Sequence, residues 1–365
     1  MALTISTNIR CNTIDCISNK GQKPPVLVID ANKVAVRYDD IGIVVLRPSI
    51  DRLKFGFFPD QKLLNKYDPS CGLDEFKEHI KKSLAGDGFQ PKVTSLSYVD
   101  GVSFKKPPYS LYNVNLIFKP SNDSEPIIIQ IDPKKGGYPF MRFDMNPNRI
   151  TKQDMKKFWE LIEGVMVVPG ANISQEDFLI WSKIYSAEIA VDILGARPSD
   201  MEIKPLVANK PVTKKSHVYK SGTGRAETVY PKVKKGKSST EYVYDKRKEQ
   251  TETGKEPVYK DFLHSRYECR VQNTTFYKLS NIKNRCVRIS VRVIDFRKFN
   301  KLSLIHHLFI RHALVRTLDK ALELIPDKSQ PKFKKSYCDT MQDIWDAKKI
   351  WSYWQGTIKD SGFFP

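Results

Sequence analysis

The sequence of 365 residues lacks the cysteine patterns that mark zinc or disulfide proteins. Its six cysteines are scattered and form no C-x-x-C pair: Cys11, Cys16, Cys71, Cys269, Cys286 and Cys338. In a chain of this length, that spacing indicates neither a zinc ribbon nor a disulfide framework. The pattern is typical of free thiols in a reducing compartment, so we expect a cytoplasmic protein.

Long apolar runs and several common motifs are also missing. No stretch approaches the roughly 18 uncharged apolar residues of a membrane span, and the opening residues lack the pattern of a secretion signal. We therefore expect no membrane partner. The chain has no G-x-x-x-x-G-K-[ST] loop and no G-x-S-x-G elbow, which excludes a Walker-type nucleotide site and a serine hydrolase elbow.

Acidic residues are scarce relative to basic ones. Asp and Glu number 41 against 61 Lys and Arg, which gives a net charge of +20. Residues 205–260 alone hold 14 basic and 6 acidic side chains. An enzyme for small neutral metabolites has no use for this excess, whereas a protein that binds a polyanion does. On charge alone, nucleic acid ranks first and an anionic membrane surface second, and the missing membrane signals count against the second. A soluble basic protein without such a partner is the plain alternative.

The apolar pattern predicts an α+β fold with a central antiparallel β-sheet or sheets flanked by helices. Hydrophobic residues make up 40% of the chain, enough for a core. Short alternating segments between turn residues predict strands, and 3.6-residue periodicity predicts helices. The strands are expected at 43–46, 51–58, 93–98, 112–118, 127–131, 140–146, 187–194, 202–207, 266–271 and 286–296, and the helices at 74–84, after Thr151 as N-cap, at 302–322 and at 337–359.

The length exceeds one ordinary core, so we expect subdivision. We divide the chain into an N-terminal extension (1–40), an N-terminal α+β half (41–170), a second half (171–300) and a C-terminal helical region (301–365). In that last region, Trp345, Trp351 and Trp354 are expected to pack in a helical core rather than to stack on bases. His306 and His307 are expected to be structural.

The predicted strand 187–194 carries two carboxylates on one face. Because side chains alternate along a strand, Glu188 and Asp192 point the same way, opposite to the β-branched residues. Two such carboxylates repel each other unless a cation lies between them, and Mg²⁺ or Mn²⁺ prefers oxygen ligands. The alternative is a polar strand edge that faces solvent.

Two tyrosines lie in a basic hairpin predicted from 227–230 and 241–245. Tyr242, Tyr244 and Lys246 are expected on one face of the strand. A tyrosine hydroxyl is a poor nucleophile until a metal or a cation helps it to ionise, and we expect Lys246 to favour that form. The alternative is an aromatic strand on a basic surface.

A third motif alternates arginine and glutamate. Arg266, Glu268 and Arg270 share one face of the predicted strand 266–271. A glutamate held between two arginines keeps its charge, so it can ligate a metal while the arginines meet phosphate. The alternative is a cross-strand ladder of ion pairs, which contributes little to stability.

In this order, the three motifs resemble those of rolling-circle replication initiators, namely the Rep-trans plasmid initiators and the gene II endonucleases of filamentous phages. The matching segments lie within about residues 180–280. They are Glu188-Ile-Ala-Val-Asp192, Thr228-Val-Tyr230, Tyr244-Asp-Lys-Arg-Lys-Glu249 and Arg266-Tyr-Glu268. The chain departs from the pattern at Glu188, where the family has Asp, and at Ser186, where it has Arg.

The resemblance implies a nickase core similar to HUH endonucleases but without a His-x-His pair, located in 171–300. It gives 41–170 an origin-binding or structural role. Tyr244 would attack a phosphate of unpaired origin DNA, single-stranded or in an extruded hairpin, leaving a 5′-phosphotyrosine and a free 3′-OH. Glu188, Asp192 and Glu268 would hold Mg²⁺ or Mn²⁺, while Lys246 and Arg266 would contact the phosphate or the tyrosine oxygen. Further DNA contacts are expected from basic side chains in and beside the hairpin: Lys232, Lys234, Lys235, Lys237, Arg247, Lys248 and Arg270. A host helicase and polymerase are the expected partners.

Several alternatives stay open from the sequence. A conjugative relaxase would use the same site to start transfer instead of replication. A non-enzymatic basic DNA-binding protein would need the charge but not the acidic strand face. Tyr242, and after it Tyr230, compete with Tyr244 for the role of nucleophile, and a homodimer is left open.

The charge excess gives the first testable prediction. Binding to DNA releases counterions from the phosphates, so the logarithm of affinity should fall by about 0.9 for each phosphate contact per tenfold rise in salt on duplex DNA. Fluorescence anisotropy with a labelled duplex, repeated from low to moderate salt, measures the slope. Affinity that does not change with salt contradicts nucleic-acid binding.

Overall fold

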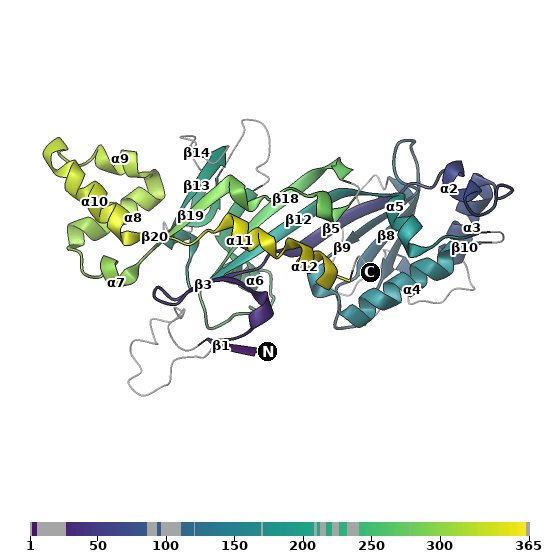
Figure 1. The fold of residues 1–365 in the computed structure, drawn as a ribbon, viewed down its shortest axis with the longest axis horizontal. Coiled ribbons are helices and arrows are strands. Elements are labelled where there is room, and N and C mark those ends of the chain that lie inside the picture. The colour runs from purple at the N-terminus through teal and green to yellow at the C-terminus, as the bar shows by residue number, and fades with distance from the viewer. Residues whose placement is uncertain are drawn as a thin grey trace. The chain divides into compact units, whose positions relative to one another are not determined.

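A computed structural model shows an α+β chain with antiparallel sheets and a helical C-terminal part, as expected (Figure 1). It describes residues 2–5, 27–85, 93–95, 111–119, 121–168, 171–207, 210–211, 217–220, 226–231, 241–276 and 278–362. No helix within these ranges is both long and apolar enough to cross a membrane. The four cysteines in these ranges are free thiols: Cys71, Cys269, Cys286 and Cys338.

The chain forms two compact units that do not follow the chain order. The first unit comprises Met1–Pro48, Ala190–Cys269 and Asn284–Trp354; the second comprises Ser49–Ile189, Arg270–Lys283 and Gln355–Pro365. This division differs from the four consecutive segments expected from the sequence. The reason is that two long strands, β12 (Ser182–Leu194) and β18 (His264–Phe276), each contribute residues to both units.

The first unit contains the predicted hairpin. In it, β16 (Ala226–Tyr230) pairs antiparallel with β17 (Glu241–Asp245), and β17 pairs with the first part of β18. The outer strand β15 (His217–Lys220) pairs with β16. On the other side of this sheet, the last part of β12 pairs with β4 (Ile43–Leu46), which pairs with β3 (Val34–Tyr38). Part of the expected extension 1–40 thus belongs to this sheet. Strands β1 (Ala2–Ile5) and β2 (Leu27–Asp30) form a separate pair.

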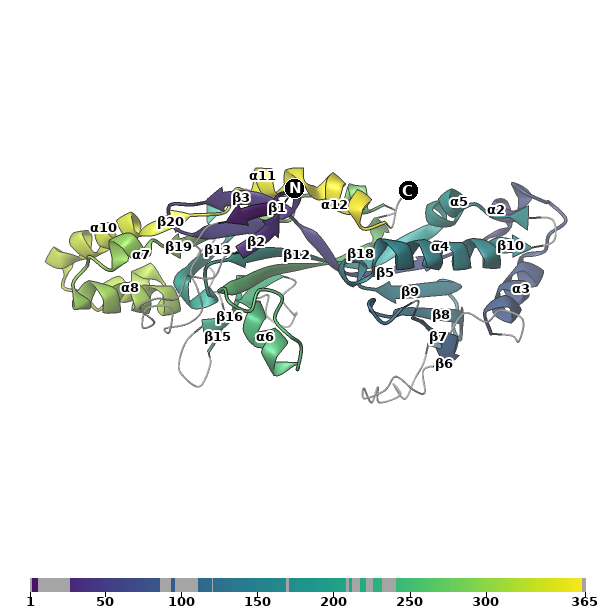
Figure 2. The ribbon, with the colours of Figure 1, turned by 90° about the horizontal axis from the view of Figure 1, so that it is seen from below.

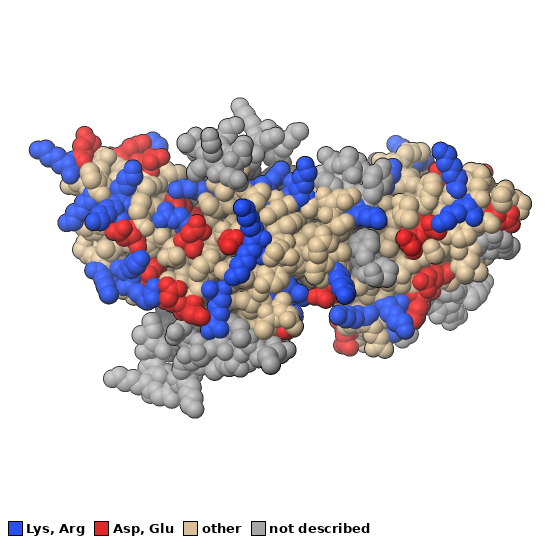
Figure 3. All heavy atoms as spheres, in the orientation of Figure 1, with Lys and Arg blue, Asp and Glu red and all other residues tan. Residues whose placement is uncertain are grey.

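A four-stranded sheet and a helical group complete the first unit. The sheet has the order β14 (Lys210–Pro211), β13 (Met201–Val207), β19 (Ile289–Ile294), β20 (Met341–Asp343). The helices that follow are α7 (Phe296–Phe299), α8 (Leu304–Arg316), α9 (Leu318–Leu322), α10 (Gln330–Thr340) and α11 (Ala347–Ser352). Over this group, basic and acidic side chains are interspersed on the face shown in Figure 3.

Three predictions for this region were partly wrong. The single helix expected at 302–322 is two helices, because Thr317 adopts a left-handed φ of 125° between them. The helix expected at 337–359 is interrupted by β20, whose residues pair with β19. Segment 286–296 begins with a short 3₁₀ turn, Cys286–Arg288, and only then becomes a strand.

Burial was confirmed for two of the three tryptophans of the C-terminal region, and both histidines make structural contacts. Trp345 and Trp354 are buried, and the Trp345 indole donates a hydrogen bond of 2.8 Å to the Cys286 carbonyl. The His307 ring lies 2.6 Å from the Phe299 carbonyl, which is a structural contact. His306 stacks on Phe333.

In the second unit, a sheet has the order β12, β5 (Ser49–Phe57), β9 (Met141–Met145), β8 (Ile127–Pro133), β7 (Tyr112–Phe118), β6 (Val93–Ser95). Figure 2 shows α4 (Lys152–Met166) lying along it. Thr151 caps this helix by accepting a hydrogen bond from the Asp154 amide, as predicted. The Phe158 ring meets Phe143 of β9 edge-on at 5.8 Å.

The remaining elements of the second unit are α2 (Gln61–Asn65), α3 (Leu73–Ala85), β10 (Val167–Val168), β11 (Ala171–Asn172), α5 (Gln175–Ile180) and α12 (Trp354–Asp360). The first residue of α12 belongs to the first unit.

Gly195, directly after β12, generates a stability prediction. Its φ is +93°, and a Cβ there would lie 2.1 Å from the Gly42 carbonyl oxygen. We expect Gly195→Ala to lower the free energy of unfolding by more than about 2 kcal/mol, because backbone strain and a clash with backbone add together. Urea denaturation measures the loss.

Gly254→Ala is the matched control. Gly254 also has a positive φ, +70°, but a Cβ there meets nothing within 4 Å. Only the strain of the left-handed backbone should remain, about 1 kcal/mol. Equal losses for the two variants would contradict the close approach of Gly195 to Gly42.

Candidate active site

The candidate site lies on one face of the sheet formed by β16, β17 and β18. Strand register places Tyr244 between Thr228 and Arg266, and it places Tyr242 opposite Glu268. The alternate residues Val229, Val243 and Tyr267 are buried on the other face. The sequence therefore predicted correctly which side chains share the polar face, because strand alternation alone decides it.

Both tyrosines bind the same carboxylate. The Tyr242 hydroxyl donates a hydrogen bond to Oε2 of Glu268, and the Tyr244 hydroxyl donates to Oε1. Glu268 itself is only 6% exposed. Burial raises the pKa of Tyr244 well above its usual value, and the negative charge of Glu268 raises it further. Tyr244 is thus a neutral phenol at pH 7, with a proton acceptor already hydrogen-bonded to it.

Lys246 contacts Tyr244, although not from the strand. The strand ends at Asp245, whose side chain accepts a hydrogen bond of 2.9 Å from the Lys248 amide and so caps α6 (Lys246–Glu252). The prediction that Lys246 continues the strand was wrong for that reason. Its Nζ still donates a 3.1 Å hydrogen bond to the Tyr244 hydroxyl.

The expectation that Lys246 favours ionised Tyr244 stays a prediction. The Lys246 ammonium lies 2.8 Å from the Glu249 carboxylate, which balances its charge. The charge of Glu249 also acts to raise the pKa of Tyr244, together with burial and Glu268.

Asp192 forms the best-connected ion pair of the site. Its two oxygens accept hydrogen bonds from Arg266 at 2.7 and 3.0 Å, a bidentate arrangement, and His264 Nε2 lies 2.7 Å from Oδ1. Burial alone would raise the pKa of Asp192, but the charges and hydrogen bonds of Arg266 and His264 outweigh it. The pKa of Asp192 consequently lies well below its usual range.

The two arginines do not hold Glu268 between them, contrary to the prediction. Arg266 turns to Asp192, and its Nη1 is 4.0 Å from Glu268 Oε1. Arg270 instead binds Glu188 at 2.6 Å, both in the second unit. Each carboxylate of β12 thus has its own arginine on β18, and Glu268 is left to the tyrosines.

The predicted metal ligands have suitable chemistry but are all engaged. Glu188, Asp192 and Glu268 offer carboxylate oxygens, the donors that Mg²⁺ and Mn²⁺ prefer. Arginine occupies the first two, and the tyrosines occupy the third. Among the residues that the structure describes, no group of three or more His, Cys, Asp or Glu side chains is arranged to hold a metal ion. The ligand set stays a prediction.

Only some of the side chains predicted to contact DNA lie within the described residues. Lys232, Lys234, Lys235 and Lys237 lie outside the described residues. Arg247 and Lys248 are on α6, and Lys248 pairs with Glu227 of β16 and, at 3.4 Å, with Glu252. Arg270 is partly exposed but is paired with Glu188.

Sequence reasoning missed His264, and it assigned no role to Glu249 although this residue ends one of the matching segments. His264 is 2% exposed and supports Asp192; its position two residues before Arg266, on the same strand face, was the available signal. Glu249 follows Lys246 by three residues, the spacing at which side chains meet on a helix. That signal was hidden because Lys246 was expected on a strand.

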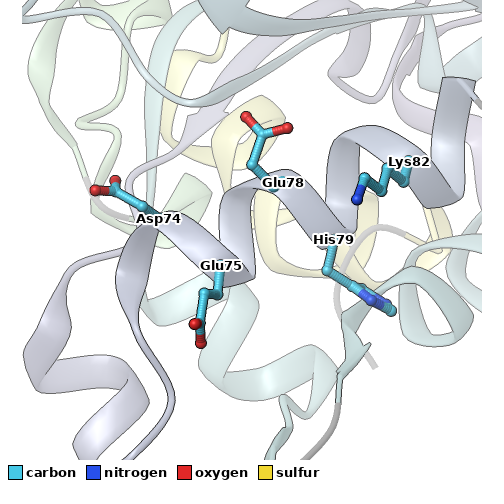
Figure 4. Close-up of a pocket in the computed structure, with 5 residues that line it drawn as sticks. All are labelled: Asp74, Glu75, Glu78, His79 and Lys82. Carbon is cyan, nitrogen blue, oxygen red and sulfur yellow. The ribbon is translucent and has the colours of Figure 1, made fainter.

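A surface depression in the second unit lacks a set of interacting side chains like the one around Tyr244. It is lined by side chains of α3 alone, namely Asp74, Glu75, Glu78, His79 and Lys82, which point in different directions in Figure 4. Side chains from one exposed helix face that do not converge cannot surround a reacting group.

Comparison with known proteins adds no assignment. Neither a protein-family model nor a curated protein sequence matches the chain.

Asp192 yields a prediction on stability and pH. Asp192→Asn removes the partner of Arg266, whose side chain is 12% exposed, and should lower the free energy of unfolding at pH 7 by about 3 kcal/mol. The pKa of Asp192 is depressed in the folded state, so its contribution is present above the unfolded pKa, near 4, and is lost as the pH falls below it. Urea denaturation from pH 7 to pH 3 should show a smaller acid loss for the variant.

Glu188→Gln is the matched control on the same strand. Its partner Arg270 is 43% exposed, and ion pairs open to solvent contribute about 0–1 kcal/mol. A loss of unfolding free energy as large as that of Asp192→Asn would show that burial does not make the Asp192–Arg266 pair stronger than the Glu188–Arg270 pair.

Proposed function

We propose that the protein is a DNA-nicking and joining initiator of rolling-circle replication, with Tyr244 as nucleophile. The observation that carries the proposal is the placement of one tyrosine hydroxyl between a buried carboxylate and a lysine ammonium, Glu268 and Lys246. Arg266 lies beside this group and has the fork geometry that suits phosphate. The nickase core, the origin DNA and the helicase and polymerase partners belong to this proposal.

The chemistry is a single transesterification. Tyr244 Oη attacks the phosphorus of an unpaired strand while its proton passes to Glu268. The bond between phosphorus and the 3′ oxygen breaks, the 3′ oxygen takes up a proton, and a 5′-phosphotyrosine forms. The number of phosphodiester bonds is conserved, so the reverse reaction rejoins the strand without nucleotide hydrolysis. That agrees with the absence of a Walker loop from the sequence.

A divalent cation remains part of the proposal. Asp192 and Glu268, with Glu188 completing the predicted set, are the residues that would hold Mg²⁺ or Mn²⁺. When bound there, the ion would neutralise charge on the phosphate. Arg266 and the tyrosines would have to release a carboxylate oxygen for it.

The rival is a basic DNA-binding protein without catalysis, and one observation favours it. Every predicted acidic ligand is satisfied by a protein partner, as in a sheet face with a purely structural role. The relaxase alternative shares the proposed chemistry and differs from it only in biological context.

Covalent adduct formation tests the proposal. The protein is incubated with a pool of random-sequence single-stranded DNA, with and without Mn²⁺, and SDS-stable adducts are isolated. Wild type should form an adduct, and Tyr244→Phe, which deletes one oxygen and keeps the ring, should form none while binding DNA normally. Tyr242→Phe should lose little.

Peptide mapping of the adduct identifies the attached residue. A linkage on Tyr242 or Tyr230 would reject Tyr244 as nucleophile and retain the reaction class. No adduct from wild type under any metal condition, together with salt-dependent DNA binding, would support the non-enzymatic alternative instead.

A further inference from the structure

The face of the sheet that carries Tyr244 is rich in aromatic residues. The rings of Tyr230 on β16 and Tyr242 on β17 have centroids 5.7 Å apart and are tilted by 35°. The rings of Tyr242 and Tyr244 follow at 5.6 Å and 38°. The three tyrosine rings therefore form one row on β16 and β17.

This row of tyrosines is not part of the hydrophobic core. Tyr230, Tyr242 and Tyr244 are each only partly buried, whereas Val229 and Val243 between them are buried on the opposite face. Partly exposed rings on a sheet can pair with one another to stabilise strand association, or they can present surface to a flat ligand. The surroundings decide between these uses.

Two features of the surroundings favour a flat anionic ligand. First, Glu268 binds the hydroxyls of Tyr242 and Tyr244, which holds both rings in place before any ligand arrives. Second, two cations lie beside Tyr244: the Lys246 ammonium donates a hydrogen bond to its hydroxyl, and Arg266 is opposite it in register on β18. A planar group joined to phosphates satisfies both, because rings stack on the plane and cations attract the phosphates.

We propose that Tyr230 and Tyr242 form a stacking platform that binds unpaired bases of single-stranded DNA beside Tyr244. The inference rests on the proposed function for the identity of the nucleic acid and adds the binding element that holds the bases next to the reacting phosphate. Duplex DNA does not fit, because its bases are stacked on one another and offer no free face. Stacking tolerates every base, so the platform positions the strand and does not select its sequence.

The test separates stacking from phosphate attraction by removing the bases from the ligand. All variants carry Tyr244→Phe, which prevents cleavage and keeps the third ring. Two fluorescein-labelled probes of about 20 nucleotides are compared, a thymidine oligonucleotide and an abasic one of equal length and charge. Tyr230→Leu should weaken binding of the thymidine probe about tenfold and leave abasic binding unchanged. Tyr230→Phe should bind both probes as the parent does.

Tyr138→Leu is the matched control. Tyr138 is 41% exposed but belongs to the second unit, so binding of both probes should be unchanged. Tyr230→Trp guards against a folding defect in the leucine variant: it keeps a stacking ring, and thymidine binding should be retained with a change of tryptophan fluorescence that the abasic probe does not produce.

Three results would overturn the platform: equal binding of the two probes by the parent, an equal loss of both probes in Tyr230→Leu, or no fluorescence difference between probes for Tyr230→Trp. These results are independent of adduct formation. An adduct from wild type with no effect at Tyr230 rejects the platform and retains nicking. A selective effect at Tyr230 without any adduct rejects nicking and retains single-strand binding.

Discussion

The shared carboxylate of Glu268 is the interaction on which the candidate site depends. It is nearly buried and accepts one hydrogen bond from each of two tyrosines on the neighbouring strand. A buried carboxylate without such donors would be costly, so the register of β17 against β18 is tied to this contact. A slip of one residue would place Val243 opposite Glu268 and turn both hydroxyls to the other face.

The ion pairs around Glu268 explain why it is available to the tyrosines. Asp192 binds Arg266 with two hydrogen bonds, and Glu188 binds Arg270. Each arginine binds a carboxylate of β12, and Arg266 Nη1 lies 4.0 Å from Glu268 Oε1, beyond hydrogen-bonding distance. The same pairing makes Asp192 a fixed anion, whereas Tyr244 stays protonated beside its acceptor. This contrast between a permanent ion pair and a hydrogen-bonded phenol is the basis of the proposed chemistry.

Prediction from the sequence succeeded where local periodicity governs the structure and failed where a change of element intervenes. The hairpin, the polar face of β18 and the N-cap at Thr151 follow from alternation and capping chemistry. Lys246 was predicted on the strand because the alternating pattern continues to it in the sequence. In the structure, Asp245 ends the strand and caps the helix that Lys246 begins. The partners of Arg266 and Arg270 were also misassigned, because alternation gives the face of a side chain but not which strand lies beside it.

The sequence by itself determined the basic excess, which depends on composition, and the α+β class. It also determined that Tyr242 and Tyr244 share one strand face and that Arg266 and Glu268 share another, because side chains alternate with a period of two residues. The tertiary structure decided which of these groups meet. Asp192 reaches His264 and Arg266, 72 and 74 residues away along the chain, because β12 and β18 are neighbours in one sheet. Pairings over such distances are set by strand order and burial, which no local pattern in the sequence encodes.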